Sequence, residues 1–269
     1  MRAVGGLLRR AAPAALVAAA VLLAAPRAEA QQRPLPWWGG LGSGTLGGAA
    51  PWGNPIGDDR VYVHGILNQN EGRFGDGSYY RWDGEVWAGT DWNRLRLRSE
   101  GRYNQNNKGR LEDGQHEALY SRAVSTFFDV VGGVRYDLDA GTGRTWTALG
   151  VEGLAPGFWR VSATAYASDN GHFAFRAKAF YDLFLTQRLV LQPQAEVNAY
   201  SKQDRGRGLG AGLSDIDMGL RLRYDVTRKF SPYVGVTYQR WFGGTLNARQ
   251  AEGLGAEDLR FVAGIRTWF

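Results

Sequence analysis

The chain has 269 residues, a formal net charge of +6 at pH 7, 38 glycines and a mean hydropathy of −0.35. This polarity excludes a bundle of transmembrane helices, because each helix needs roughly 20 consecutive apolar residues. It permits a transmembrane β-barrel, which hides polar residues in its lumen. The absence of cysteine excludes disulfides, thiolate metal sites and a cysteine nucleophile. No basic cluster is set among stacking aromatics, which argues against nucleic-acid binding.

Residues 1–30 have the features of a secretory signal peptide. A basic segment precedes an apolar run over 11–25, and Ala28-Glu29-Ala30 offers small residues for cleavage. The apolar run is shorter than the roughly 20 residues of a membrane span, so we predict cleavage rather than anchoring. Residues 31–59 are rich in Gly, Pro and Trp and show no hydrophobic periodicity. They predict a flexible periplasmic arm.

Residues 60–269 alternate between apolar and polar side chains, as β-strands with two different faces do. Over 215–224, even-numbered residues are apolar and odd-numbered residues are charged or glycine. The pattern predicts about twelve strands, an even number that suits bacterial single-chain barrels. The strands are expected near 61–71, 79–88, 92–103, 112–124, 128–138, 144–153, 158–168, 172–183, 187–200, 213–226, 230–242 and 258–268. We therefore predict an all-β fold, a transmembrane antiparallel up-and-down β-barrel.

The predicted connections and the end of the chain favour the outer membrane. Every second connection is short, whereas the others include long segments at 104–110, 201–212 and 243–257. Short periplasmic turns with longer outer loops are typical of outer-membrane barrels. The last strand ends on Phe269, which resembles the sorting signal of such barrels. A secreted β-sandwich would need an apolar core between its sheets, yet the second face here is crowded with charge.

The polar face is predicted to line the lumen, where opposite charges can pair. These side chains either brace the barrel or form a polar passage for ions, and the two interpretations are compatible. The charged residues assigned to this face are Arg94, Arg96, Arg98, Glu100, Arg135, Asp137, Arg176, Lys178, Glu196, Asp215, Asp217, Arg221, Arg223 and Arg266.

Seven segments of the predicted barrel carry longer, more specific motifs. They are 117–123 (EALYSRA), 133–137 (GVRYD), 148–156 (ALGVEGLAP), 181–193 (YDLFLTQRLVLQP), 198–202 (NAYSK), 208–222 (GLGAGLSDIDMGLRL) and 261–266 (FVAGIR). With these motifs, roughly residues 58–269 resemble the copper-resistance protein B family of Gram-negative outer-membrane proteins. The resemblance implies a barrel in copper tolerance that binds or moves copper ions and acts with periplasmic copper-binding proteins. Members often carry an N-terminal segment rich in Met and His, but 31–59 contains neither residue.

The candidate copper ligands are imidazoles and carboxylates, which suit Cu(II), because thioether ligands for Cu(I) are almost missing. Met218 is the one methionine beyond the predicted signal peptide, and its strand position points to lipid. His64 shares a predicted strand face with Asn68 and Asn70 and is expected in the lumen. The sequence leaves open which face of its strand His116 occupies. His172 is expected near an outer loop. The candidates are His64, His116, His172, Asp215 and Asp217.

Three classes of function are compared. The resemblance favours an outer-membrane barrel in copper homeostasis, with the copper ion as ligand or cargo and with outer-membrane lipid and periplasmic copper proteins as partners. The alternative is a general small-solute porin without specific copper binding, which the scarcity of Met and His supports. An enzyme is not expected, because no paired nucleophile and base are evident around Ser121, Ser125 and His116.

Overall fold

The computed structural model describes residues 61–75, 77–104, 110–138 and 143–269, without the side chains of 110–112 and 205. The predicted signal peptide over 1–30 and the predicted arm over 31–59 lie outside the described residues. Within the described part of the chain, no helix is long and apolar enough to cross a membrane.

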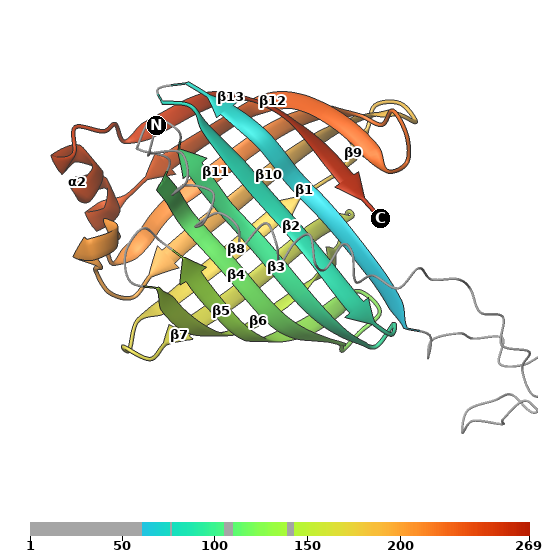
Figure 1. The fold of residues 1–269 in the computed structure, drawn as a ribbon, viewed down its shortest axis with the longest axis horizontal. Helices are drawn as coiled ribbons and strands as arrows, with labels where there is room; N and C mark the ends of the chain where they lie inside the picture. The colour runs from blue at the N-terminus through green and yellow to red at the C-terminus, as the bar shows by residue number, and fades with distance from the viewer. Residues whose placement is uncertain (1–60, 76, 105–109, 139–142) are drawn as a thin grey trace, which may run out of the picture. The chain divides into compact units, whose positions relative to one another are not determined.

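The described residues form one antiparallel sheet that closes on itself (Figure 1). Each strand pairs with its neighbours in the chain, and β1 pairs with β13 to complete the ring. The two-residue β9 pairs with β10 beyond the end of β8, so twelve strands make up the wall. The predicted antiparallel barrel is confirmed. The strands are β1 (Tyr62–Phe74), β2 (Tyr79–Gly89), β3 (Asn93–Asn104), β4 (Arg110–Ala123), β5 (Phe128–Leu138), β6 (Arg144–Ala155), β7 (Trp159–Ser168), β8 (Phe173–Phe180), β9 (Leu183–Phe184), β10 (Leu189–Tyr200), β11 (Gly212–Tyr224), β12 (Phe230–Trp241) and β13 (Glu257–Trp268).

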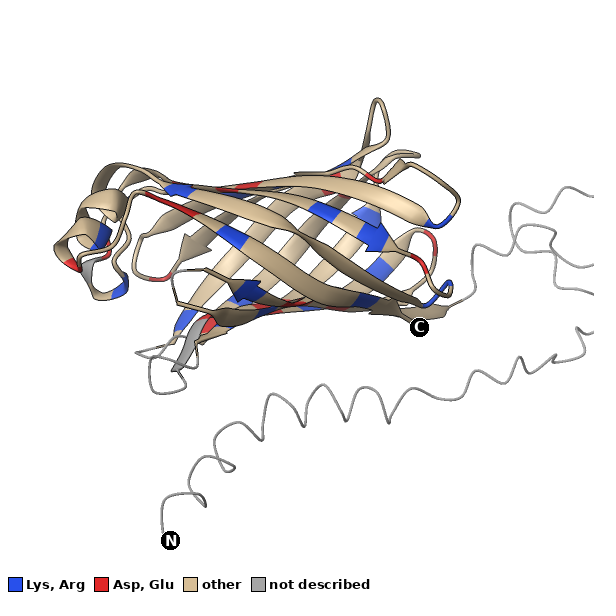
Figure 2. Cartoon of the chain, turned by 90° about the horizontal axis from the view of Figure 1, so that it is seen from above, with Lys and Arg blue, Asp and Glu red and all other residues tan. Residues whose placement is uncertain are grey.

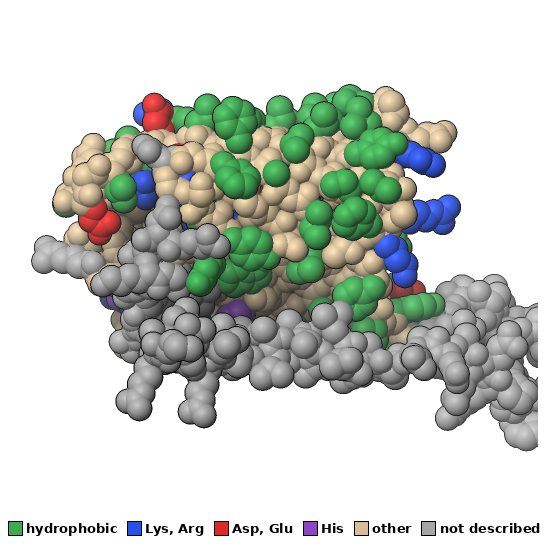
Figure 3. All heavy atoms as spheres, turned by 45° about the horizontal axis from the view of Figure 1, so that its top comes forward, with side chains coloured by type: hydrophobic (Ala, Val, Ile, Leu, Met, Phe, Trp, Pro, Cys, Tyr) green, Lys and Arg blue, Asp and Glu red, His purple; other side chains and the backbone are tan. Residues whose placement is uncertain are grey.

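The two faces of the wall differ as the alternation predicts. On β11, Leu220 is 43% exposed on the outer surface, whereas its neighbour Arg221 is 3% exposed inside the barrel. Hydrophobic side chains cover much of the outer surface (Figure 3). Acidic and basic positions are spread along the strands instead of gathering in loops (Figure 2). Inside, a small apolar cluster around Leu119, Trp146 and Tyr166 fills part of the lumen.

The two ends of the barrel are unequal. One end carries the short turns 90–92, 124–127, 156–158, 185–188 and 225–229 together with the start of β1 and the end of β13. We call this the inner end and the opposite one the outer end. The outer connections contain two elements where only loops were predicted. These are the short helix η1 (Arg205–Arg207) and the helix α2 (Gly243–Ala251).

A β-bulge in β1 changes which residues face the lumen. The register with β2 shifts between Leu67 and Gln69, so the face assignment reverses at this point. His64 faces the lumen, as predicted. Asn70 does not share that face: it lies on the outer surface, where it accepts a hydrogen bond from the Tyr80 hydroxyl. The prediction for Asn70 was wrong because strict alternation cannot reveal an inserted residue.

Candidate functional site

The lumen is crossed at mid-height by ion pairs between opposite walls. Lys178 on β8 lies 2.6 Å from Glu100 on β3, 3.6 Å from Glu196 on β10 and 3.7 Å from Asp83 on β2. Arg176 also pairs with Glu100. β8 and β2 are separated by six steps around the ring, which places them opposite each other. These side chains therefore occupy the centre of the barrel, and we call them the central ion pairs.

A second cluster joins β1 to β11 across the two strands between them. Glu71 is fully buried and accepts hydrogen bonds from Arg221, from Arg73 and from the Tyr233 hydroxyl at 2.8–2.9 Å. Arg73 also pairs with Asp217 at 2.9 Å. Two cations and two anions balance one another here. The cluster thus connects β1 to β11 and β12 across the seam between the first and last strands of the chain.

A third group lines the wall from β2 to β6 toward the inner end. Arg96 and Arg98 both pair with Glu85 and Glu152, and Arg94 lies 3.3 Å from Asp129. The arginines of β3 thus pair with carboxylates of β2, β5 and β6. The lumen-facing assignment of these arginines from the sequence agrees with their contacts.

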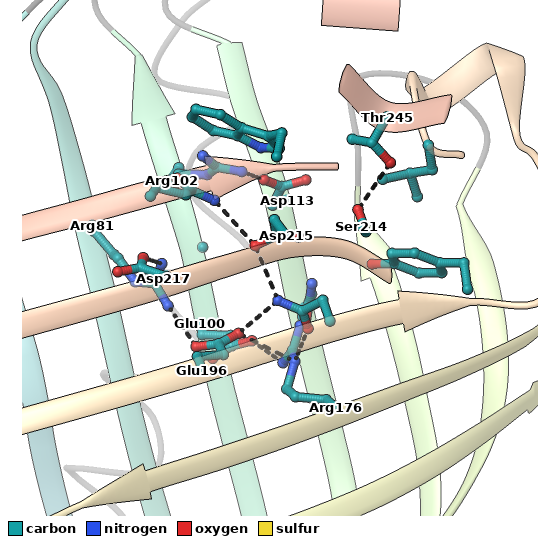
Figure 4. A pocket seen from close by; sticks show the side chains of 17 residues that line it. Arg81, Glu100, Arg102, Asp113, Arg176, Glu196, Ser214, Asp215, Asp217 and Thr245 are labelled. Atoms are coloured by element: carbon teal, nitrogen blue, oxygen red, sulfur yellow. Dashed lines mark hydrogen bonds and ion pairs between the residues drawn. The ribbon is translucent and has the colours of Figure 1, made fainter. Parts of the chain in front are cut away.

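A cavity of about 100 Å³ lies between the central ion pairs and the outer end (Figure 4). Asp215 projects into it and accepts hydrogen bonds from Gln239 at 3.2 Å and from Asn198 at 3.4 Å. Among the residues that the structure describes, no cationic group lies within 4.0 Å of Asp215. The side-chain oxygen of Gln115, which also lines this cavity, is buried without a hydrogen-bond partner. Asp215 therefore has no ion-pair partner among the described residues.

The outer loops cover this cavity. The hydroxyl of Thr245 on α2 accepts a hydrogen bond from the backbone N–H of Gly210 at 2.8 Å and lies 3.0 Å from the hydroxyl of Ser214. Arg249 of the same helix lies over the Trp241 ring. A Cβ at Gly210 would meet the backbone of α2 at 2.3 Å, so glycine is required for this close approach. Helix and loop thus form a packed cap.

The structure does not bring the five predicted metal ligands together. His64 lies near the inner end between the rings of Trp87 and Trp268, at centroid distances of 5.7 and 5.6 Å. His116 pairs across β4 and β5 with Tyr136 on the outer surface. His172 lies in the outer connection before β8. In the described ranges, no group of three or more His, Cys, Asp or Glu residues is placed to hold a metal ion.

The two predicted aspartates differ from each other. Asp217 pairs with Arg73 at 2.9 Å and with Arg81 at 3.5 Å, in agreement with the predicted pairing of opposite charges in the lumen. Asp215 remains available in the cavity. The sequence interpretation missed Glu71 and Arg73, which the bulge concealed. It also missed Arg81 of β2, although the alternation of charges at 81, 83 and 85 was a usable signal.

The closed ring, the apolar outer surface and the charged lumen define an outer-membrane-type β-barrel. The fold is similar to that of the NanC porin, with a TM-score of 0.50 at 12% identity. This likeness covers 77% of this chain and 99% of the porin, and it concerns the fold alone.

Sequence comparison identifies the family. The family model described as copper resistance protein B precursor matches residues 61–269. The chain is 45% identical over 194 residues to a copper resistance protein B homolog of Pseudomonas syringae pv. tomato, covering 72% of this chain and 65% of that protein. It is 38% identical over 218 residues to copper resistance protein B of Escherichia coli, covering 81% and 73%. The chain belongs to the copper resistance protein B family, as the sequence motifs predicted.

Proposed function

We propose that this chain is an outer-membrane barrel that passes copper ions along its lumen in copper resistance. In this proposal Asp215 receives the ion in the cavity on the outer side of the central ion pairs. Copper is cargo, and the barrel performs no catalysis. Family membership supports the link to copper resistance. The unpaired Asp215 is the observation that carries the role of the cavity.

The ligands of the cavity favour Cu(II). Carboxylate and amide oxygens are poor ligands for the soft Cu(I) ion, which prefers thiolates and thioethers. One carboxylate with neighbouring amide groups holds a divalent ion loosely. Loose binding suits a passage, because an ion that moves on must be able to leave each position. The carboxylates deeper in the lumen are already neutralised by arginine or lysine.

A general porin-like channel is the second candidate. The absence of a preformed ligand cluster in the described residues supports it. The central ion pairs argue against a wide passage, because they reach between opposite walls. A porin for small solutes leaves an open aqueous path. We therefore favour a narrow, ion-handling lumen over free diffusion.

The proposed location is the outer membrane, with lipid around the wall and the short turns on the periplasmic side. The exposed apolar residues of the outer surface support contact with lipid. Periplasmic copper-binding proteins are the proposed partners at the inner end. Outer-membrane fractionation of cells that produce the full chain tests the location, and recovery in the soluble periplasmic fraction would contradict it.

Calorimetry on the full chain purified from membranes tests the role of Asp215. We expect saturable Cu(II) binding that weakens at least tenfold in Asp215→Asn, and no comparable binding of Cu(I) under reductant. Asp169→Asn is the matched control, because Asp169 is an exposed carboxylate in an outer turn. Equal binding by all three proteins would contradict the proposal. Loss of copper tolerance in cells that carry Asp215→Asn, with normal barrel levels, would link the site to resistance.

A further inference from the structure

The inner part of the lumen holds more cationic than anionic groups. Its carboxylates are all engaged: Glu85 and Glu152 with Arg96 and Arg98, and Asp129 with Arg94. Asp182 and Asp225 both pair with Arg223, at 3.5 and 3.0 Å. Two further arginines of this region, Arg160 and Arg266, have no carboxylate within 4.0 Å among the described residues.

Arg266 lies on the lumen face of β13. It pairs across the sheet with Ser231, which is buried inside the barrel, and its side chain is half-buried. No hydrogen bond or ion pair reaches its guanidinium from the described residues. The charged groups that act on it most strongly are Arg223, Asp182 and Arg160. The two nearby carboxylates, Asp182 and Asp225, both form ion pairs with Arg223, so Arg266 has no ion-pair partner of its own among the described residues.

Arg160 lies on the lumen face of β7, near the inner end. It pairs across the sheet with Phe180, and its guanidinium lies 5.5 Å from the centre of that ring. The side chain is exposed to solvent. Five steps around the ring separate β7 from β13, so the two arginines extend from nearly opposite walls.

The rim around this opening is also basic. Exposed basic side chains project from the end opposite α2 (Figure 3). At the inner ends of the strands and in the short turns, the exposed basic residues Arg122, Arg188, Arg228 and Lys229 form no ion pair with a described residue. Asp91 is the one exposed carboxylate of the five short turns. A cleft with one sign of charge and walls of low dielectric constant concentrates ions of the opposite sign.

We propose that Arg266, assisted by Arg160, forms an anion-binding site at the inner opening of the lumen, which takes a small carboxylate or phosphate group. The guanidinium presents a planar fork of donors that fits both groups in a bidentate manner. Partial burial strengthens the attraction relative to bulk water. The lumen is therefore polarised, with the unpaired carboxylate of Asp215 toward the outer end and unpaired guanidinium groups toward the inner end. The anion site stands independently of the copper proposal.

The test measures binding of citrate and of inorganic phosphate to the full chain at constant ionic strength, because the salt concentration alters the field of the exposed arginines. We expect saturable binding of at least one probe, weakened tenfold or more in Arg266→Gln and severalfold in Arg160→Gln. Arg266→Lys should give an intermediate affinity, since lysine keeps the positive charge but lacks the planar set of N–H donors of the guanidinium. Comparison of the two probes shows whether the site prefers carboxylate or phosphate.

Arg188→Gln is the matched control, because it removes one positive charge from the rim outside the lumen. Its affinity should stay within twofold of the parent chain. Absence of saturable binding by the parent chain would overturn the proposal. So would equal weakening in Arg188→Gln and Arg266→Gln, which would indicate a diffuse field without a defined site. If Arg266→Gln fails to assemble, Arg160→Gln and Arg266→Lys carry the same comparison.

Discussion

The ammonium group of Lys178 lies 3.7 Å from the carboxylate of Asp83, although the two residues stand on opposite walls of the barrel. Contact between opposite walls requires that side chains fill the width of the lumen at this height. Glu100 and Glu196 surround the same ammonium group. Side chains from opposite walls therefore narrow the charged lumen at this height.

Removal of both partners of this contact should open the passage. In Lys178→Ala/Asp83→Ala, the two charges disappear together, so neither is left without its partner at this contact. We expect a severalfold rise in single-channel conductance in planar bilayers. Lys202→Ala, which shortens an exposed lysine in an outer loop, should match the parent chain. Unchanged conductance in the double variant would mean that other side chains close the lumen.

Glu71 should be more important for stability than its single charge suggests. Glu71→Gln keeps the size of the side chain but removes the carboxylate that two buried arginines share. Breaking a buried ion pair on one side costs about 3–5 kcal/mol, because the remaining charge stays buried. Urea unfolding of the refolded barrel should show this loss. Glu252→Gln, an exposed residue after α2, should change the free energy of unfolding by less than about 0.5 kcal/mol.

The alternation in the sequence was sufficient to predict the barrel, because each lumen residue differs chemically from its lipid-facing neighbour. On β11, the predicted inward positions Asp217, Arg221 and Arg223 are buried, whereas the predicted lipid-facing positions Met218, Leu220 and Leu222 are exposed. The same reasoning could not locate the bulge after Leu67, since one inserted residue leaves no mark in composition. It also could not predict α2, whose Thr245 is held by contacts from distant loop residues.

The candidate site was predicted less completely than the fold. Strand parity places Asp215 and Asp217 on one face, but parity alone cannot tell which of them has a cationic partner. That distinction depends on Arg73 and Arg81, which come from strands far away in the sequence. The pairing of β4 with β5 determines which face of the sheet His116 occupies, and this pairing depends on the tertiary structure.

The facing of β11 predicts opposite effects of polar substitutions at adjacent positions. Leu220→Arg places a guanidinium on the lipid-facing surface, which costs roughly 2–4 kcal/mol at the bilayer midplane. We expect a marked drop in folded barrel in the outer-membrane fraction, measured by heat-dependent gel mobility. Gly219→Ser, on the lumen side of the same strand, should assemble normally. The group nearest to a Cβ at position 219 is the guanidinium of Arg221, and this long side chain can shift. Normal assembly of Leu220→Arg would contradict the facing assignment.

The position of His116 predicts that it does not bind copper in the lumen. Its side chain lies on the outer surface beside Tyr136, away from Asp215. We expect His116→Gln to keep the Cu(II) affinity of the parent chain in calorimetry, whereas Asp215→Asn weakens it at least tenfold. A variant that replaces His64, His116 and His172 together measures the total contribution of imidazole. Loss of binding in that variant with full binding in Asp215→Asn would transfer the copper site to the histidines.

The contact between Gly65 and Phe269 predicts how the barrel closes. The backbones of these residues exchange two hydrogen bonds, at 2.9 and 3.1 Å, and join the end of the chain to β1. The Phe269 ring covers Gly65 so closely that a Cβ there would lie 2.1 Å from the ring.

Gly65→Val should displace the ring and lower the folded fraction on refolding into lipid vesicles. Gly132→Val is the control, because its Cβ would meet its nearest neighbours at 3.8 Å. Phe269→Ala added to Gly65→Val should restore refolding in vesicles, where no cellular sorting signal is needed, because it removes the clash. Failure to restore it would mean that the ring itself, and not the space at Gly65, controls closure.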